Sequence, residues 1–289
     1  MLISGKYFVL FQQGLLHKEA ILQVSCIIPT RDRCRMVLQA LDSIARQQWI
    51  DLEVIVVDDG STDNTVPAVS GRFPDAKLVR LDGEGPGSAR NAGADAAQGD
   101  CLMFLDSDDL WLDDHIAKLV QVLNRGFEVA YGTTSTIDEI NGGQFLIPDN
   151  GAGPQGDCFK EMLRWCFMVP STMAVSRKAF QGVGGFGDEQ YGEDWTFFTR
   201  LAARYPFGFA GPQPITLRRL HPGSFCFLAD QQKPLAIIHQ MLTGLENEPK
   251  ATDTDMRRFI MMKEWTSRNA GRWSTIQEWY QSMLQEDII

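Results

Sequence analysis

Two acidic clusters in the sequence have residue types and spacing that suit a metal ion. Asp58 and Asp59 follow the apolar run 52–57, and Asp106 and Asp108 follow the apolar run 101–105. Crowded carboxylates repel one another unless a cation or several hydrogen-bond donors compensate. Oxygen ligands of this kind suit Mg²⁺ or Mn²⁺, which usually keep positions open for substrate phosphates. Together the clusters point to a divalent cation and a diphosphate, whereas each cluster alone is better explained as a turn.

The elements around these clusters predict where they lie. Apolar, β-rich runs at 24–29, 52–57, 77–81 and 101–105 alternate with segments of helical periodicity. This alternation is typical of a parallel sheet with crossover helices. Ligands of such sheets bind outside the carboxyl ends of the strands, where both clusters fall. The expected fold class is α/β, with an open, mostly parallel sheet flanked by helices and a helical C-terminal extension.

The second half of the chain has a mixed pattern. Residues 129–134 and 171–176 predict strands, and residues 157–167 and 194–205 predict helices. Between them, residues 141–156 form a Gly-, Pro- and Asn-rich stretch that predicts a long loop. This loop and the helix after it are expected to shape a substrate site.

Composition excludes several classes of protein. The net charge is −10 and the pI about 4.9, which argues against a nucleic-acid binder because such proteins need a basic face. No stretch approaches the ~20 apolar residues of a transmembrane helix, and residues 7–11 are too short for the core of a signal peptide. The six cysteines form no C-x-x-C pair, which favours reduced thiols in a cytoplasmic protein.

Four segments in order resemble the family 2 glycosyltransferases of GT-A fold. They are 24–30 (VSCIIPT), 56–63 (VVDDGSTD), 89–93 (ARNAG) and 104–109 (FLDSDD). The resemblance covers about residues 22–222. It implies an inverting, metal-dependent enzyme that moves one sugar from a nucleotide-diphosphate sugar to a hydroxyl acceptor. The cofactor would be Mn²⁺ or Mg²⁺, and the acceptor a carbohydrate or a lipid-linked molecule of cell-surface polysaccharide or glycolipid assembly.

The resemblance also divides the chain. Residues 22–112 would be the nucleotide-binding half of a glycosyltransferase domain, and residues 113–222 its acceptor half. Residues 1–21 are interpreted as an extension with an extra strand, and residues 223–289 as a helical region. We expect the C-terminal helices to pack on the domain. A homodimer through them is the alternative, as is contact with the inner face of a membrane, which the acidic composition disfavours.

The resemblance assigns site residues by position. Asp59 would accept the imide N–H of uracil or thymine, with uracil preferred only as the family's commonest base and guanine left open. Asp108 would bind the metal directly, and Asp106 the ribose or the metal through water. His221 is a further metal ligand or a loop histidine without a role, and Arg218 a weaker candidate for the diphosphate. The nucleotide-binding residues implied are Pro29, Thr30, Arg31, Asp59, Arg90, Asp106 and Ser107.

A second acidic pair, Glu193-Asp194, follows the glycine-rich segment 184–186. The resemblance places the general base here, with Asp194 the better match and Glu193 beside it. A carboxylate at a helix start is stabilised by the helix dipole and should stay ionised near neutral pH. It could then take a proton from an acceptor hydroxyl. The alternative is that Asp194 only caps its helix.

Other functions fit less well. A nucleotidyltransferase usually has a Gly-rich basic loop after its first strand, where this chain has Pro29-Thr30-Arg31. A dinucleotide oxidoreductase would need G-x-G-x-x-G there. A non-catalytic nucleotide-sugar-binding protein remains an alternative, against which the three carboxylates Asp106, Asp108 and Asp194 argue. Processive synthases carry Gln-x-x-Arg-Trp, which is absent, so transfer of a single sugar is expected.

Overall fold

The computed structural model describes residues 22–188 and 192–224, together with seven single positions between 262 and 285. The N-terminal extension and its expected strand lie outside the described residues. So does most of the expected helical region 223–289, although the seven described positions there are helical. Met262 is buried in a core of the domain and Trp265 packs against the same core. These two residues bear out the expectation that a C-terminal helix packs on the domain.

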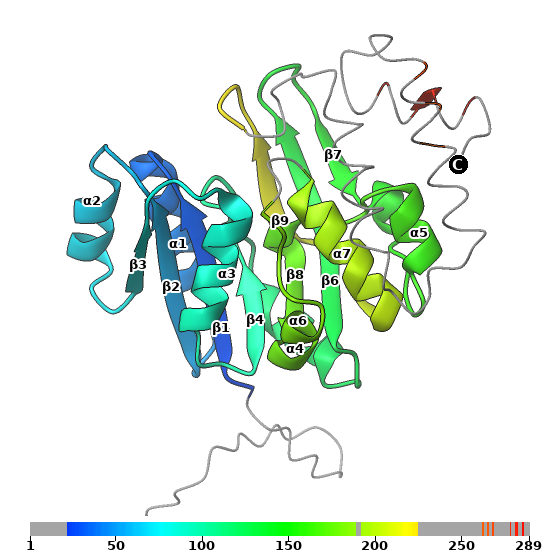
Figure 1. Cartoon of the computed structure of the whole chain (residues 1–289), viewed down its shortest axis with the longest axis horizontal. Coiled ribbons are helices and arrows are strands. Elements are labelled where there is room, and N and C mark those ends of the chain that lie inside the picture. The colour runs from blue at the N-terminus through cyan, green and yellow to red at the C-terminus, as the bar shows by residue number, and fades with distance from the viewer. Residues whose placement is uncertain are drawn as a thin grey trace, which may run out of the picture.

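Within the described residues the chain forms one nine-stranded sheet with helices on both faces (Figure 1). The strand order is β3-β2-β1-β4-β8-β6-β9-β5, and β7 pairs with β6. The strands are β1 (Val24–Thr30), β2 (Leu52–Asp59), β3 (Lys77–Leu81), β4 (Cys101–Phe104), β5 (Leu110–Trp111), β6 (Val129–Asp138), β7 (Gln144–Ile147), β8 (Met173–Ser176) and β9 (Phe207–Leu220). The helices are α1 (Cys34–Ala45), α2 (Thr65–Arg72), α3 (Pro86–Ala96), α4 (His115–Leu123), α5 (Phe159–Arg164), α6 (Arg177–Gly182) and α7 (Glu193–Arg204).

The N-terminal strands form a parallel sheet, as predicted. β1 pairs in parallel with β2 and β4, and β2 pairs in parallel with β3. The carboxyl ends of β1, β2 and β4 therefore meet at one edge, because parallel neighbours end on the same side. Thr30 is the register partner of Asp58 at that edge. The predicted α/β fold with its open sheet is confirmed.

The second half is mixed, and here the sequence missed several elements. β8 runs antiparallel to β4 and β6, whereas β9 runs parallel to β6. β9 and α6 have no counterpart among the predicted elements, and in the first half neither do α2 and the two-residue β5. The predicted loop 141–156 contains β7, which closes a hairpin on β6, and a short 3₁₀ turn at Asp149–Gly151. The predicted helix 157–167 is shorter, because Trp165 is already extended.

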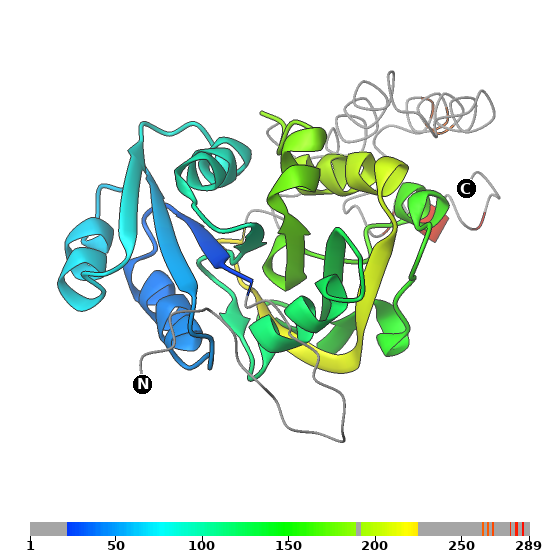
Figure 2. The same ribbon diagram turned by 90° about the horizontal axis from the view of Figure 1, so that it is seen from below.

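Alternation along the buried strands supplies two hydrophobic cores, one on each face of the sheet. Ile27, Leu102 and Phe104 point to the face covered by α3, α5 and α7 (the α3-side core). Cys26, Ile28 and Met103 point to the face covered by α1 and α4 (the α1-side core). Figure 2, turned by 90°, shows the sheet between these two helical layers. Strands buried on both faces read as continuous apolar runs, which is why the sequence identified them.

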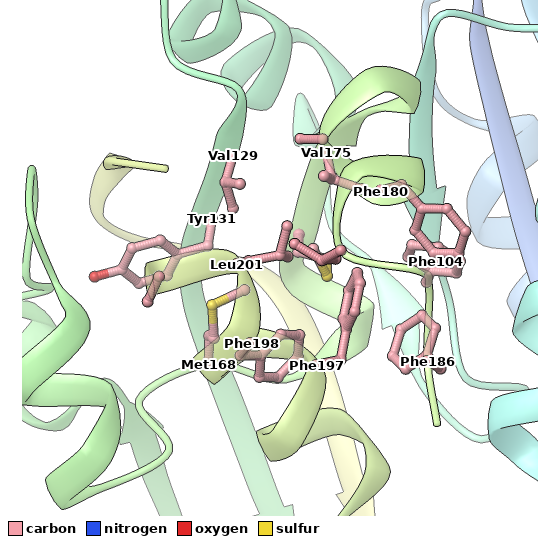
Figure 3. Close-up of a cluster of buried hydrophobic side chains, with 14 of the residues drawn as sticks. Phe104, Val129, Tyr131, Met168, Val175, Phe180, Phe186, Phe197, Phe198 and Leu201 are labelled. Carbon is pink, nitrogen blue, oxygen red and sulfur yellow. The ribbon is translucent and has the colours of Figure 1, made fainter. Parts of the chain in front are cut away.

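The α3-side core is rich in aromatic rings (Figure 3). Phe186 packs on Phe197 with ring centroids 4.1 Å apart and planes tilted by 31°, and it meets the edge of Phe104 at 5.2 Å. Phe186 belongs to the segment before α7, and Phe104 ends β4. This contact fixes the segment that leads to Glu193-Asp194 against the strand that leads to Asp106 and Asp108.

Two further findings concern membrane spans and thiols among the described residues. Among the described residues, no helix is both long and apolar enough to span a membrane. Five cysteines within the described part of the chain are free thiols, namely Cys26, Cys34, Cys101, Cys158 and Cys166. Burial raises the pKa of Cys26 well above its ordinary value, so this thiol stays protonated.

Candidate active site

Asp59 organises the loop that leads from β3 into α3. Its carboxylate accepts backbone N–H groups from Gly83 at 3.1 Å, Glu84 at 2.7 Å and Gly85 at 2.9 Å. Gly83 and Gly85 have φ of 89° and 93°, which side chains rarely adopt, so the two glycines allow this curled loop. The predicted nucleotide residue Asp59 is therefore also the anchor of the loop at the start of α3.

Thr30 and Arg31 lie beside this loop at the end of β1. Thr30 is buried, and its Oγ1 has no hydrogen-bond partner among the described residues. Arg31 is exposed and lies over Gly83, since a methyl group on Gly83 would come within 3.1 Å of Arg31 Nη1. Asp58 is buried and accepts the N–H of Ser61 at 3.3 Å, which shapes the turn after β2. Of this predicted group, Thr30, Arg31 and Asp59 share one edge of the sheet.

Arg90 joins the Asp106–Asp108 cluster to the Glu193-Asp194 pair. It projects from α3 and donates through Nη2 to Asp106 at 2.6 Å and through Nη1 to Glu193 at 2.9 Å. The guanidinium also lies over the ring of Phe186, 5.1 Å from its centroid. Arg90 is almost fully buried, and its two carboxylate partners keep it charged. The structure thus brings together three predicted site residues that are up to 103 positions apart in the sequence.

α3 is also bound directly to the segment before α7. The amide of Asn91 donates to Phe186 O and accepts from Phe186 N, both at 2.9 Å. Gly87 approaches so closely that a methyl group there would come within 2.2 Å of Gly187 O. Because Asp59 anchors the start of this helix, α3 is a common support for both halves of the site.

The loop after β4 is held by a residue that the sequence analysis did not select. Asp109 is buried; it accepts from Ser171 Oγ at 2.6 Å and from the Arg219 amide at 3.2 Å. Burial, followed by the charges of Asp108 and Asp106, raises the pKa of Asp109 to about 8. Ser171 Oγ in turn accepts the amide of Asp106 at 3.1 Å. Asp109 therefore positions the two carboxylates before it, and Ser107 is buried in the same loop.

Asp108 lies among cationic and imidazole donors. Its Oδ2 is bonded to Arg33 Nη1 and lies 3.2 Å from His221 Nε2. Arg33 Nη2 also donates to Gly223 O at 2.9 Å. Two of the candidate metal ligands, His221 and Asp108, therefore lie together, and Arg33 is a further member that the sequence analysis did not select.

The donor set of Asp108 and His221 fits a divalent cation. Adjacent ligands that are each about 2.1 Å from an octahedral ion lie roughly 3.0 Å apart, close to the observed 3.2 Å between Oδ2 and Nε2. Among the described residues there is no group of three or more His, Cys, Asp or Glu side chains that could hold a metal. Small hard cations are commonly held by one or two protein ligands plus phosphate oxygens, so two ligands are enough for the fit.

The second acidic pair opens α7, as predicted, and burial affects its ionisation. Gly192 is the N-cap, and Glu193 and Asp194 occupy the first turn. Asp194 accepts its neighbour's amide, Trp195 N, at 2.7 Å, so it is not the cap residue. Burial raises the pKa of Asp194, and burial together with Asp194 raises the pKa of Glu193 to about 7. The helix start favours the charged form of Asp194, as expected, whereas burial opposes it and raises its pKa.

The fold and these carboxylates define a class of protein, namely an α/β enzyme fold with paired acidic sites at one edge of its sheet. The model of the family described as glycosyl transferase family 2 matches residues 25–184, more than half of the chain. The chain belongs to this family of glycosyltransferases.

Relatives and solved structures agree with this assignment. A glycosyltransferase of Haemophilus influenzae without an assigned activity is 34% identical over 201 residues, covering 68% of each chain. GalNAc(5)-diNAcBac-PP-undecaprenol beta-1,3-glucosyltransferase of Campylobacter jejuni is 29% identical, over 62% of this chain and 59% of the relative. A Nostoc glycosyltransferase is 31% identical, and the chain spans about half (53%) of its length.

The fold resembles that of two structurally known enzymes. TarS of S. aureus, solved as residues 1–349 in complex with UDP-GlcNAc, superposes with a TM-score of 0.66 at 18% identity, over 87% of this chain and 74% of that one. The mannosyltransferase PcManGT of Pyrobaculum calidifontis, in complex with GDP-Man and Mn²⁺, superposes with a TM-score of 0.60 at 20% identity, over 87% and 73%. At these identities the likeness establishes the fold.

Proposed function

We propose that this glycosyltransferase moves a single sugar from a nucleotide-diphosphate sugar to a hydroxyl acceptor with inversion of the anomeric centre. The observation that carries the proposal is the Arg90 bridge, which places Asp106 and Glu193 on two nitrogens of one guanidinium. Residues predicted for the donor and for the acceptor therefore lie in one cluster. An enzyme that transfers a group directly between two substrates needs this arrangement.

The hydrogen bonds of Asp59 favour a uracil or thymine base. An ionised carboxylate has about four acceptor positions, and three are taken by the amides of residues 83–85. The one that remains, on Oδ2, suits a base with a single N–H on its recognition edge, such as uracil or thymine. Guanine presents two kinds of N–H donor there and would leave one unpaired. The guanidinium of Arg31 lies at the same edge for the base or ribose, and Thr30 Oγ1, buried there without a partner among the described residues, could be reached by a ligand that enters this edge.

Asp108 and His221 would hold Mg²⁺ or Mn²⁺ together with the donor's phosphates. When bound, the ion supplies Lewis-acid stabilisation of the leaving diphosphate. Arg218 adds positive charge nearby, because it lowers the pKa of both Asp109 and Asp194. Arg218 thus lies in electrostatic range of the loop after β4 and of Asp194. A diphosphate bound between these two groups would need a counter-charge there.

Asp194 would act as the general base. Its Oδ1 accepts the Trp195 amide, which orients the carboxylate. Glu193 is occupied by Arg90, so Asp194 is the carboxylate better placed to receive the acceptor's proton. Its raised pKa brings its basicity closer to that of a hydroxyl in the transition state, which favours proton transfer. Attack from the side of Asp194, opposite the leaving diphosphate, inverts the configuration.

The acceptor class rests on the relatives. The Campylobacter relative is named for a polyprenyl-diphosphate-linked acceptor, and we propose a carbohydrate or lipid-linked acceptor for this chain as well. An acceptor of that kind would bring a cytoplasmic enzyme to the inner face of a membrane.

The deciding experiment measures release of nucleoside diphosphate from UDP- and GDP-sugars, with Mn²⁺ or with EDTA. We expect release from a UDP-sugar in Mn²⁺ only. The Asp194→Asn variant should bind donor with unchanged affinity yet lose at least about 100-fold in turnover, since a general base contributes roughly that much. Release of pyrophosphate would instead indicate a nucleotidyltransferase. Donor binding without any turnover in the presence of varied acceptors would indicate a binding protein.

A further inference from the structure

Arg33 is bonded to the oxygen of Asp108 that also faces His221, the other candidate ligand of a divalent cation. Its Nη1 is bonded to Asp108 Oδ2, and that same oxygen lies 3.2 Å from His221 Nε2. A metal held by Asp108 and His221 in this arrangement would contact Oδ2, the oxygen that faces Nε2. Arg33 and the metal compete for one carboxylate oxygen, and two cations at such a distance repel each other strongly.

The loop around Arg33 holds it in this position. Asp32 has φ of 49° and accepts the amides of Thr62 at 2.7 Å and Asp63 at 3.2 Å, which binds the β1–α1 loop to the β2–α2 loop. The amide of Arg33 itself donates to Thr65 Oγ1 at 3.2 Å. The backbone of Arg33 is therefore fixed on both sides, and its side chain alone is free to change partners.

The same arrangement holds the segment after β9. Arg33 Nη2 donates to Gly223 O at 2.9 Å, and the amide of Gly223 donates to His221 Nδ1 at 3.1 Å. Since Nδ1 accepts, the proton of a neutral ring is on Nε2, which then donates to Asp108. Metal binding by Nε2 requires the proton on Nδ1 instead, so the Gly223 contact must break. The arginine bond and the imidazole bond to Gly223 thus belong to one metal-free arrangement.

We propose that Arg33 is a built-in competitor of the metal, which neutralises Asp108 in the unloaded enzyme and is displaced when a divalent cation binds. The inference rests on the proposed function, in that the metal is the one that accompanies the donor. Once displaced, the guanidinium lies next to the donor's diphosphate, whose oxygens fit its planar fork. Metal and donor would then bind as a unit, because the phosphates accept the arginine that the metal releases.

The test measures Mn²⁺ binding directly, by electron paramagnetic resonance of free Mn²⁺, without any sugar substrate. We expect Arg33→Gln to bind Mn²⁺ about 10-fold or more tightly than the unchanged protein. Arg35→Gln is the matched control, because Arg35 lies two residues away in α1 and is exposed. It removes the same charge without touching Asp108, and its effect should stay below about 3-fold, since screened surface charges act weakly.

Unchanged or weaker Mn²⁺ binding in Arg33→Gln overturns the proposal. Weaker binding would mean that the metal uses the other oxygen of Asp108 and that Arg33 orients the carboxylate. If neither protein binds Mn²⁺, the proposal also fails. A second readout is hydrogen exchange of the peptide containing Gly223, which should increase when Mn²⁺ is added to the unchanged protein. Both readouts are independent of turnover. Failure of this proposal can therefore be distinguished from failure of the proposed transferase activity.

Discussion

Arg90 Nη1 lies 2.9 Å from Glu193 Oε1, and both side chains are more than nine-tenths buried. The other terminal nitrogen of Arg90 binds Asp106 at 2.6 Å. A buried guanidinium with two carboxylates is strongly destabilised when one partner is removed, because the remaining charges lose their compensation. The buried Arg90 therefore couples the stability of the loop after β4, which carries Asp106, to that of α7, which carries Glu193.

Replacing Arg90 with Met should lower the free energy of unfolding by about 3 kcal/mol, since Glu193 and Asp106 then lose their shared cation. The double variant Arg90→Met, Glu193→Gln should recover at least about 1 kcal/mol of this loss, because it removes one of the two unpaired carboxylates. Urea unfolding of the three proteins measures both quantities. A double variant that is less stable than the single one contradicts the explanation by unpaired charge.

The pH dependence of catalysis should reflect the Glu193–Asp194 pair. Burial raises both pKa values, that of Glu193 to about 7. A carboxyl group with a raised pKa keeps its proton until the pH passes that value, so activity that needs both carboxyls ionised should rise as the pH passes through about 7, the pKa of Glu193. We expect kcat/KM at pH 6 to be roughly 10-fold lower than at pH 8.

The Glu193→Gln variant should move this inflection to lower pH, because it removes a neighbouring negative charge and leaves Arg90 closer to charge balance with Asp194. Glu139→Gln, at an exposed position after β6, is the control and should leave the profile in place. A profile in Glu193→Gln that is unchanged, or shifted to higher pH, would show that the pair does not control the titration.

Local sequence was enough to predict the parallel half of the sheet and its acidic loops. β1, β2 and β4 are largely apolar runs; Asp58 and Asp59 end β2, and Asp106 lies two residues after β4. β9 was not predicted, since its residues 207–220 include two glycines and two prolines and its pairing with β6 has register shifts. Such interruptions remove the regular alternation on which strand prediction depends.

The partners of the site residues could not be predicted for a different reason. Arg33 is 75 residues from Asp108, and Asp109 is 62 residues from Ser171. Each of these residues resembles an ordinary loop or turn residue in its own segment. Only the order of the strands brings them together, and the sequence carries no local signal of that order beyond the parallel units. The one available hint was that Asp109 directly follows Asp108 in the sequence.

His115 should make the protein sensitive to acid. It is fully buried, stacks on Trp111 with centroids 4.2 Å apart, and lies 3.0 Å from Ile215 O through Nδ1. Burial lowers the pKa of His115 from 6.5 to about 3. Below pH 6.5 the imidazole of His115 is therefore protonated in the unfolded chain and stays neutral in the folded chain. Stability from this group is complete above pH 6.5 and is lost as the pH falls from there towards 3, by up to about 1.4 kcal/mol per pH unit.

The measurement is the free energy of unfolding from pH 7 to 4 for the unchanged protein and for His115→Phe. The Phe variant should be less stable at pH 7, because the carbonyl of Ile215 loses one of its two donors and keeps only the amide of Leu112. Its slope with pH should nevertheless be smaller. Equal slopes in the two proteins would exclude His115 as a source of acid sensitivity.

Gly87 should tolerate no side chain, although it lies in the first turn of α3, where alanine normally stabilises a helix. A methyl group there would come within 2.2 Å of Gly187 O, a backbone atom that cannot rotate away. Gly87→Ala should therefore separate α3 from the segment before α7, lower the melting temperature, and reduce kcat more than donor affinity. Gly71→Ala is the matched control, because Gly71 lies in α2 with nothing within 4 Å, and it should be neutral or stabilising by up to about 1 kcal/mol. If Gly87→Ala behaves like Gly71→Ala in both melting and kcat, the close contact between the two halves of the site is not required for catalysis.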